Sequence, residues 1–297
     1  MKQSKTKKKP LLLVLLHRLT ENRKAFIVFL VLMVLTVAAL IRSIVLAQWE
    51  NVLLALLTLV LFLIPPLFEN NFHIKLPTTL EILAFCFAFC AEVLGEIGCF
   101  YVNIPGWDTI LHTLSGFMFA AFGFCLADIF NRGKFRFQLS PVYMAIVAFC
   151  FSMTTGVLWE FIEFFIDRSL GMDMQKDTLL QGIISVTFDK TNSNIPIHMD
   201  NITQTIICME DGSQYIIQGG YLDVGLFDTM KDLLVNFAGA LVFSIFGFFY
   251  VKQKGKGKVA SQFIPVYVGK EEDADHAALP EAEAVTKDAP TADNRDA

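Results

Sequence analysis

The chain has 297 residues, of which 54% are hydrophobic and 29 are phenylalanine. A soluble domain carries a smaller apolar fraction, and several apolar runs reach the roughly 20 residues that a membrane-spanning helix needs. The composition excludes an ordinary soluble enzyme and gives no reason to expect a nucleic-acid partner. The formal net charge of −5 says little, because a basic N-terminus and an acidic tail offset each other.

The first 24 residues are basic and contain an apolar run, 11–16, that is too short to cross a bilayer. We expect residues 1–24 to be a cytoplasmic segment that lies against anionic headgroups. A signal peptide is the alternative, because a basic segment precedes an apolar one.

Six apolar segments predict an all-α polytopic membrane bundle over residues 25–250. They lie at residues 25–46, 52–68, 79–101, 108–130, 141–166 and 226–250. Lys and Arg gather before the first segment, after the fourth and after the sixth, and basic loops favour the cytoplasmic side. The chain is therefore expected to cross the plasma (inner) membrane several times, with both termini cytoplasmic.

The long loop at residues 167–225 is extracytoplasmic in this topology. Two Ile-rich runs, 203–209 and 214–218, flank the turn signal Glu210-Asp211-Gly212-Ser213, which predicts a β-hairpin. Residues 183–188 are expected to add a third strand. The tail at 251–297 is rich in Ala, Glu, Asp and Lys, a composition typical of disorder.

Acidic residues recur at the predicted outer ends of four helices. Spacings of three or four residues place them on one face of each helix, and carboxylates at membrane depth usually face a protein-lined or watery interior. The topology therefore predicts one outward-facing polar pocket, lined by Glu92, Glu96, Asp108, His112, Glu160, Glu163, Asp228, Asp232 and Asn236.

Carboxylates and one histidine are suitable ligands for a divalent cation, which can activate water or polarise a phosphoryl or acyl oxygen. The candidate metal ligands are Asp108, His112, Glu160, Glu163, Asp228 and Asp232. Within this set, His112, Glu160 and Glu163 are the candidate catalytic groups. The candidate substrate or supporting residues are Glu92, Glu96, Trp107, Ser115, Trp159 and Asn236.

Structural interpretations remain open for several of these residues. Asp108 and Asp228 can each cap the first turn of a helix. Trp107 and Trp159 are also typical of the aromatic belt at a membrane interface. Glu92 and Glu96 can line a water crevice without a further role.

Three motifs occur in order along the chain: Trp107-Asp108-Thr-Ile-Leu-His112-Thr-Leu-Ser-Gly116, Trp159-Glu160-Phe-Ile-Glu163, and Asp228-Thr-Met-Lys-Asp232 followed by Gly239. They resemble the bacterial YjdF-type inner-membrane proteins and, more faintly, the VanZ-like membrane proteins. The resemblance covers residues 101–241 and implies the fold and the polar site, but it supplies no reaction. The loop at 167–225 is longer than the resemblance leads us to expect.

Two classes of function follow from these residues. The first is a divalent-metal-dependent hydrolase or transferase that acts on lipid or envelope substrates. The alternative is a proton- or cation-coupled transporter or a ligand-binding membrane module. A structural protein that docks an envelope partner through the loop is a third option, and membrane lipids are expected partners in every case.

Overall fold

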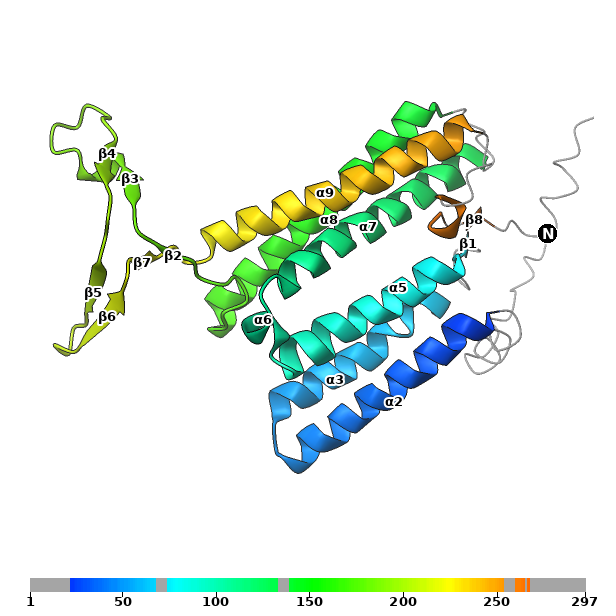
Figure 1. Ribbon diagram of the computed structural model, residues 1–297, viewed down its shortest axis with the longest axis horizontal. Helices are drawn as coiled ribbons and strands as arrows, with labels where there is room; N and C mark the ends of the chain where they lie inside the picture. Colours follow the sequence, from blue (N-terminus) through cyan, green and yellow to red (C-terminus); the bar gives the residue numbers. More distant parts are fainter. Residues whose placement is uncertain (1–21, 68–73, 133–138, 254–259, 265, 268–297) are drawn as a thin grey trace, which may run out of the picture.

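The fold is taken from a computed structural model that describes residues 22–67, 74–132, 139–253, 260–264 and 266–267 (Figure 1). Long helices form a bundle, and a β insertion projects from one end of it. Most of the basic segment predicted at residues 1–24 lies outside the described residues. The helices are α2 (Arg23–Val45), α3 (Trp49–Leu61), α5 (Thr78–Ala88), η1 (Phe89–Ile97), α6 (Phe100–Asn103), α7 (Trp107–Arg132), α8 (Pro141–Leu170) and α9 (Leu226–Lys252).

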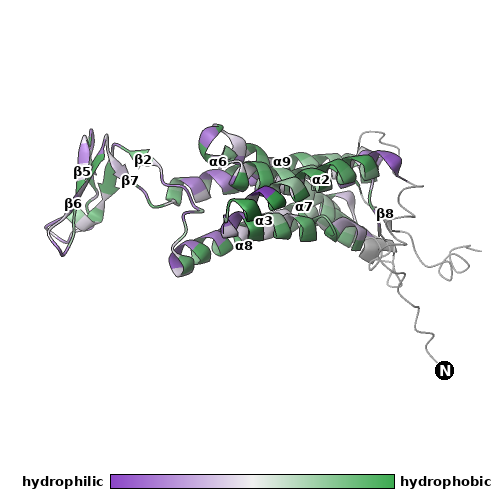
Figure 2. Ribbon diagram, turned by 90° about the horizontal axis from the view of Figure 1, so that it is seen from below, coloured by the Kyte–Doolittle hydropathy of each residue, from purple (hydrophilic) through white to green (hydrophobic). Residues whose placement is uncertain are grey.

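Within the described residues, five helices are long and apolar enough to cross a membrane: Arg23–Val45, Trp49–Leu67, Trp107–Asp128, Pro141–Leu170 and Leu226–Lys252. They match five of the six predicted segments. Apolar residues cover the length of the bundle and hydrophilic residues gather at its ends (Figure 2). The chain is thus an all-α polytopic membrane protein with a small β insertion.

The third predicted segment, 79–101, has a different build. The 11-residue α5 continues directly into η1, a π-helix of 9 residues. The helix stops at Gly98, and Cys99 adopts a left-handed backbone with φ of 57°. At about 1.5 Å per residue the combined helix reaches about 30 Å, so its length also suits a membrane crossing.

The described residues of the bundle form two hydrophobic cores. In the first, α2, α3 and α5 meet at Phe29, Phe62 and Phe85, whose ring centroids lie 5.3–6.1 Å apart. In the second, α7, α8 and α9 meet at Phe124, Met144 and Phe243. The first turn of α5 joins this second core through Leu80. The predicted polar helices α7, α8 and α9 therefore form one packing unit.

Glycines bring these three helices unusually close together. A Cβ atom on Gly239 of α9 would collide with the carbonyl oxygen of Thr113 on α7, and one on Gly116 would collide with the carbonyl oxygen of Asn236. A Cβ atom on Gly156 of α8 would lie 2.6 Å from the Asn236 Nδ2 atom. Small residues allow such backbone approach between membrane helices. This packing fixes the distance between the polar faces of α7 and α9.

The β insertion contains the predicted hairpin. Strands β5 (Gln204–Cys208) and β6 (Gln214–Gln218) pair antiparallel, with Ile206 opposite Ile216. The expected third strand does not join them, because β3 (Ile183–Ser185) pairs with β4 (Ile197–Met199) in a separate two-stranded sheet. Strands β2 (Leu179–Leu180) and β7 (Tyr221–Leu222) close the base of the insertion. The pairs β2–β7, β3–β4 and β5–β6 are therefore separate two-stranded sheets and do not form one larger sheet.

The connection between β3 and β4 is organised by Asp189. Its carboxylate accepts hydrogen bonds from the hydroxyl and backbone N–H of Thr191 and from the backbone N–H groups of Ser193 and Ile195. These bonds, first among them the one from the Thr191 hydroxyl, lower the pKa of Asp189 to about 2. A carboxylate that accepts several hydrogen bonds favours its charged form, so this turn is held in place at neutral pH.

The prediction of a disordered tail over 251–297 is wrong for its first part. Helix α9 continues to Lys252, and the 3-10 helix η3 (Ala260–Gln262) and strand β8 (Val266–Tyr267) follow. Strand β8 pairs with β1 (Ile74–Lys75), and Ile264 is 3% exposed in the second core. The apolar residues Phe263 and Ile264 therefore hold this part of the polar tail against the second core. Residues 268–297 lie outside the described part.

Candidate functional site

The polar ends of four helices lie at the same end of the bundle. Helices α7 and α9 begin there, and η1 and α8 end there, next to the β insertion (Figure 1). These are the helix ends that were predicted to carry the acidic residues. The side chains that meet come from α7, α8 and α9.

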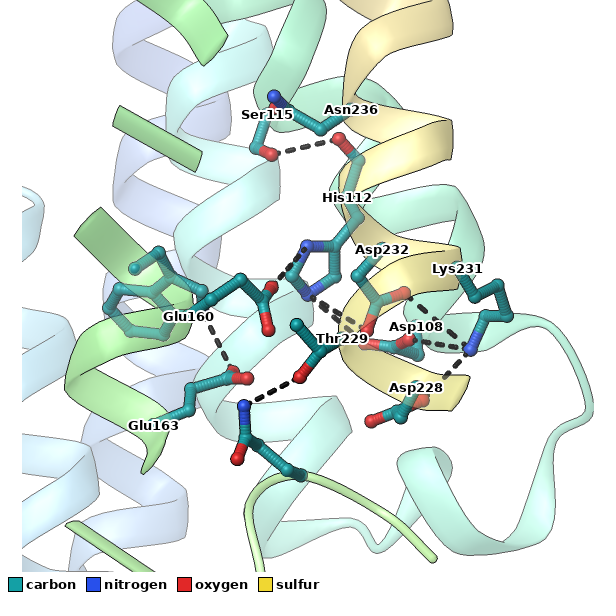
Figure 3. Close-up of polar contacts among 12 residues, drawn as sticks. Asp108, His112, Ser115, Glu160, Glu163, Asp228, Thr229, Lys231, Asp232 and Asn236 are labelled. Carbon is teal, nitrogen blue, oxygen red and sulfur yellow. Dashed lines mark hydrogen bonds and ion pairs between the residues drawn. The ribbon is translucent and has the colours of Figure 1, made fainter. Parts of the chain in front are cut away.

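Asp108, His112 and Asp232 form the centre of the site. One potential ligand atom from each of them lies within 4.8 Å of the other two. His112 Nε2 is 3.3 Å from Asp108 Oδ1 and 3.9 Å from Asp232 Oδ2 (Figure 3). Donor atoms that share one metal ion at about 2.1 Å lie about 3 to 4 Å apart. The spacing and the oxygen and imidazole ligands therefore suit a divalent cation.

The triad is buried between α7 and α9. The side chain of Asp232 is 2% exposed, that of His112 14% and that of Asp108 25%. Asp108 and His112 are four residues apart on α7, so they share one helix face. The accessible side of the triad is therefore the Asp108 side.

Lys231 lies on that side and contacts the remaining carboxylate oxygens. Its Nζ atom is 3.2 Å from Asp108 Oδ2, 3.5 Å from Asp232 Oδ1 and 3.0 Å from Asp228 Oδ1. Asp108 and Asp232 therefore each bridge a histidine and a lysine (Figure 3). Asp228 was a candidate metal ligand, but the structure places it on the lysine side, away from the His112 ring.

Glu160 approaches the opposite nitrogen of the same ring. Its Oε1 atom is 4.0 Å from His112 Nδ1, and its side chain is 5% exposed. Neither Glu160 oxygen has a hydrogen-bond partner in the described structure. A histidine that binds metal through one nitrogen usually directs its other N–H to a carboxylate. Glu160 therefore lies where the carboxylate partner of a metal-binding histidine is usually found.

Glu163 lies one turn further along α8 and accepts a hydrogen bond from Trp159 Nε1 at 2.7 Å. The residue is 8% exposed. It is not part of the group of possible ligand atoms formed by Asp108, His112 and Asp232. Trp159 is therefore both a partially exposed residue at the helix end and the direct partner of a predicted site residue.

A strap formed by residues 174–178 passes over the ends of α8 and α9. Asp167 accepts hydrogen bonds from the backbone N–H groups of Met174 and Gln175, at 2.6 and 2.9 Å. Asp228 accepts one from Lys176 N at 2.9 Å, and Asp223 accepts one from Thr178 N at 2.7 Å. Carboxylates at the helix ends thus hold the strap beside the buried site.

Glu92 and Glu96 lie apart from the triad. In the described part of the chain, neither makes a hydrogen bond or ion pair with Asp108, His112 or Asp232. Glu96 instead lies close enough to Lys176 of the strap for electrostatic attraction. Trp107 donates to Cys90 O at 3.3 Å and packs edge-on against Phe100, so it connects α7 to η1. Tyr101 interacts electrostatically with Glu92, Glu96, Asp108 and Glu163, so the two η1 acids lie near the site without an ion pair or hydrogen bond to the triad in the described residues.

Ser115 and Asn236 lie deeper in the bundle than the triad. The Ser115 hydroxyl donates to the His112 backbone oxygen at 2.9 Å. Asn236 is 2% exposed, its Nδ2 atom is 3.6 Å from Met153 Sδ, and its Oδ1 atom has no hydrogen-bond partner in the described structure. Asn236 therefore extends the polar face of α9 one turn below Asp232.

Two neighbours of Glu160 were not among the predicted site residues. Thr229 lies between the His112 ring and Glu163 (Figure 3), and its hydroxyl accepts a hydrogen bond from Gln175 Nε2 at 2.6 Å. Both residues lie beside the Glu160 carboxylate. Thr229 follows Asp228 directly and could have been found from its helix face. Gln175 could not, because only the folded strap brings it to α9.

Comparison with known proteins agrees with this architecture. The family model described as "Predicted membrane protein (DUF2238)" matches residues 25–253. The match covers well over half of the chain, so the chain belongs to this family. The resemblance to YjdF-type proteins is consistent with it.

One relative is a Thermotoga maritima protein named "Uncharacterized protein", which is 28% identical over 125 residues. The matched region covers 42% of this chain and 63% of the relative. No solved structure matches the chain significantly.

Proposed function

We propose that this DUF2238 protein binds a divalent metal ion between α7 and α9 and uses it as a hydrolase or transferase on lipid or envelope substrates. The observation that carries the proposal is the convergence of Asp108, His112 and Asp232 within 4.8 Å. Two carboxylates and a neutral imidazole would balance the charge of a divalent ion. Bound there, such an ion could activate water or polarise a phosphoryl or acyl oxygen.

The residues around the triad support this assignment. Glu160 faces His112 Nδ1 and would orient the ring, which metal-binding histidines require. Lys231 holds the outer oxygens of both aspartates and would keep their inner oxygens directed toward His112.

The location supports a substrate from the membrane surface. Asp108 and His112 lie in the first two turns of α7, and Asp232 lies in the first two turns of α9. These helix ends are next to the β insertion (Figure 1), where lipid headgroups would surround the bundle. In the proposed topology this end faces the outside of the plasma membrane. The β insertion would then meet envelope components directly.

Metal analysis of the purified protein tests the proposal. We expect about one divalent ion per wild-type chain and little or none in His112→Gln and Asp232→Asn. Glu96→Gln is the matched control, because this acid lies at the same end of the bundle outside the triad, and it should keep the metal. Wild-type protein that stays metal-free after incubation with zinc, manganese and magnesium would contradict the proposal.

A transporter of protons or cations is the second candidate, and one observation favours it. Asn236 Oδ1 and Ser244 Oγ are buried on α9 beyond Asp232, without hydrogen-bond partners in the described structure. Polar groups at such depth often form relays. Cation flux into liposomes that is abolished by Glu160→Gln, from protein that binds no metal, would support this function over the first.

A further inference from the structure

The two glutamates of α8 form a second negatively charged group on the other side of the His112 ring. Glu160 is 4% and Glu163 is 8% exposed, and they are three residues apart, on one face of the helix. Trp159 donates a hydrogen bond to Glu163, and Thr229 and Gln175 are the polar groups next to Glu160. Both carboxylates are buried, and these three neutral side chains bring no positive charge to them.

No basic side chain among the described residues compensates for these charges. The Lys and Arg residues of that part of the chain make no ion pair with Glu160 or Glu163, and Lys231 is engaged by Asp108, Asp228 and Asp232. The nearest basic side chain is His112 at 4.0 Å, but it is a neutral ligand in the proposed metal site, and its other nitrogen faces the aspartates. A buried carboxylate without a partner costs several kcal/mol in effective terms. A further cation near Glu160 and Glu163 would compensate this charge.

The surrounding groups favour an ammonium over a second metal ion. The Thr229 hydroxyl and the Gln175 amide, which are hydrogen-bonded to each other, lie beside Glu160, and the Trp159 indole donates a hydrogen bond to Glu163. A primary ammonium has three N–H donors and is also attracted to aromatic rings. Glu160 and Glu163 are, moreover, outside the group of ligand atoms that could share one metal ion.

The position of Trp159 indicates the source of the ammonium. Trp159 is 44% exposed and lies next to Leu158, which is 54% exposed, while Phe161 on the same helix is 64% exposed. In a membrane protein such an apolar face contacts lipid, and Trp is enriched at the depth of the headgroups. The exposed side of Trp159 would therefore face the lipid headgroups, while its indole N–H contacts Glu163.

We propose that Glu160 and Glu163 bind the primary ammonium of a zwitterionic phospholipid headgroup, which enters from the membrane beside Trp159. This inference rests on the proposed function in one respect, namely that a metal ion occupies the aspartate side of His112. The lipid phosphate would then face that metal ion and Lys231, while the ammonium faces the glutamates. The two halves of the site thus match the two charges of the headgroup.

The test uses the full-length protein in detergent, saturated with metal ion, and measures binding of dioctanoyl phosphatidylethanolamine. Dioctanoyl phosphatidylglycerol, which has the same phosphate and no ammonium, is the matched probe. We expect at least about tenfold tighter binding of the ethanolamine lipid, which is about 1.4 kcal/mol. Glu163→Gln should abolish the difference between the lipids, and Glu96→Gln should keep it.

Three results would overturn the inference. These are equal affinity of the wild-type protein for both lipids, an ethanolamine preference that survives Glu163→Gln, and a second bound metal ion that is lost in Glu163→Gln. Free ethanolamine that competes as well as the lipid would show that the ligand is a soluble amine rather than a membrane lipid. Metal content is measured on the same samples. A protein that binds no metal ion but still prefers the ethanolamine lipid would contradict the proposed function and leave the assignment of Glu160 and Glu163 to the ammonium intact.

Discussion

At the scale of single residues, the site depends on how closely two backbones approach. Gly116 and Gly239 have no side chains, and any Cβ atom there would meet a carbonyl of the facing helix. Asp108 and His112 are one to two turns from Gly116, and Asp232 is two turns from Gly239 on the partner helix. The distance of 3.9 Å between His112 Nε2 and Asp232 Oδ2 therefore depends on these glycines.

The substitution Gly239→Ala tests this dependence. Forcing a methyl group into a tight contact typically costs about 1 to 3 kcal/mol, so the variant should unfold at a lower temperature and bind metal more weakly. Ala238→Val adds methyl groups at the neighbouring position, which is exposed on α9, and serves as the control. Thermal unfolding in detergent and metal content are the measurements. A Gly239→Ala protein that matches Ala238→Val in both would show that the close approach is not needed.

At the scale of elements, the strap at residues 174–178 connects the β insertion to the site. Three carboxylates, Asp167, Asp223 and Asp228, accept hydrogen bonds from its backbone. Gly225 begins α9 with a positive φ of 84°, and a Cβ atom there would lie 2.7 Å from Gln175 Cβ. The strap therefore lies tightly against the start of α9 and brings Gln175 to Thr229.

Removing one anchor should loosen the strap without unfolding the helices. Hydrogen bonds to a charged group are worth about 1.5 to 3 kcal/mol, so Asp167→Ala should speed amide hydrogen exchange at Met174 and Gln175 by at least about tenfold. Exchange in the hairpin of β5 and β6 should not change. Asp200→Ala, in an exposed loop of the insertion, is the control. Unchanged exchange in Asp167→Ala would mean that other contacts hold the strap.

At the scale of the whole molecule, the two packing units are joined at both ends of the bundle. Trp107 connects α7 to η1 at the end that carries the site, and α5 and the segment that follows α9 connect the units at the opposite end. Phe263 stacks edge-on against Phe117 of α7 with ring centroids 5.2 Å apart, and Ile264 is buried in the same core as Leu76 and Leu80. Strand β8 then pairs with β1 just before α5.

This connection predicts that Ile264 matters for stability although it lies in a polar tail. Truncation of a buried isoleucine to alanine costs about 2 to 5 kcal/mol. Ile264→Ala should therefore lower the unfolding temperature clearly, whereas Gln262→Ala, at an exposed position, should not. Thermal unfolding of both variants in the same detergent makes the comparison. Equal unfolding temperatures for Ile264→Ala and the wild type would show that this segment does not bind the two units together.

The amino-acid sequence is sufficient to establish the class of the protein and the approximate ends of its helices. Long apolar runs such as the one that becomes α9 must be helical in a membrane, because backbone groups have no water to bond with there. Spacings of three and four residues are enough to place Asp108 with His112, and Glu160 with Glu163, on single helix faces. The Ile-rich hairpin is also recognisable, because its turn residues lie between two β-forming runs.

Which of these faces meet is set by the packing of the folded chain. Periodicity fixes a face relative to its own helix, but the rotation and neighbours of that helix depend on packing contacts such as those of Gly116 and Gly239. That is why Glu92 and Glu96, which look equivalent to the other acids in sequence, lie outside the triad. It is also why Gln175 and Ile264, which lie in a loop and a tail, belong to the folded core or the site. Long-range contacts of this kind are set by the shape of the assembled helices and not by local spacing.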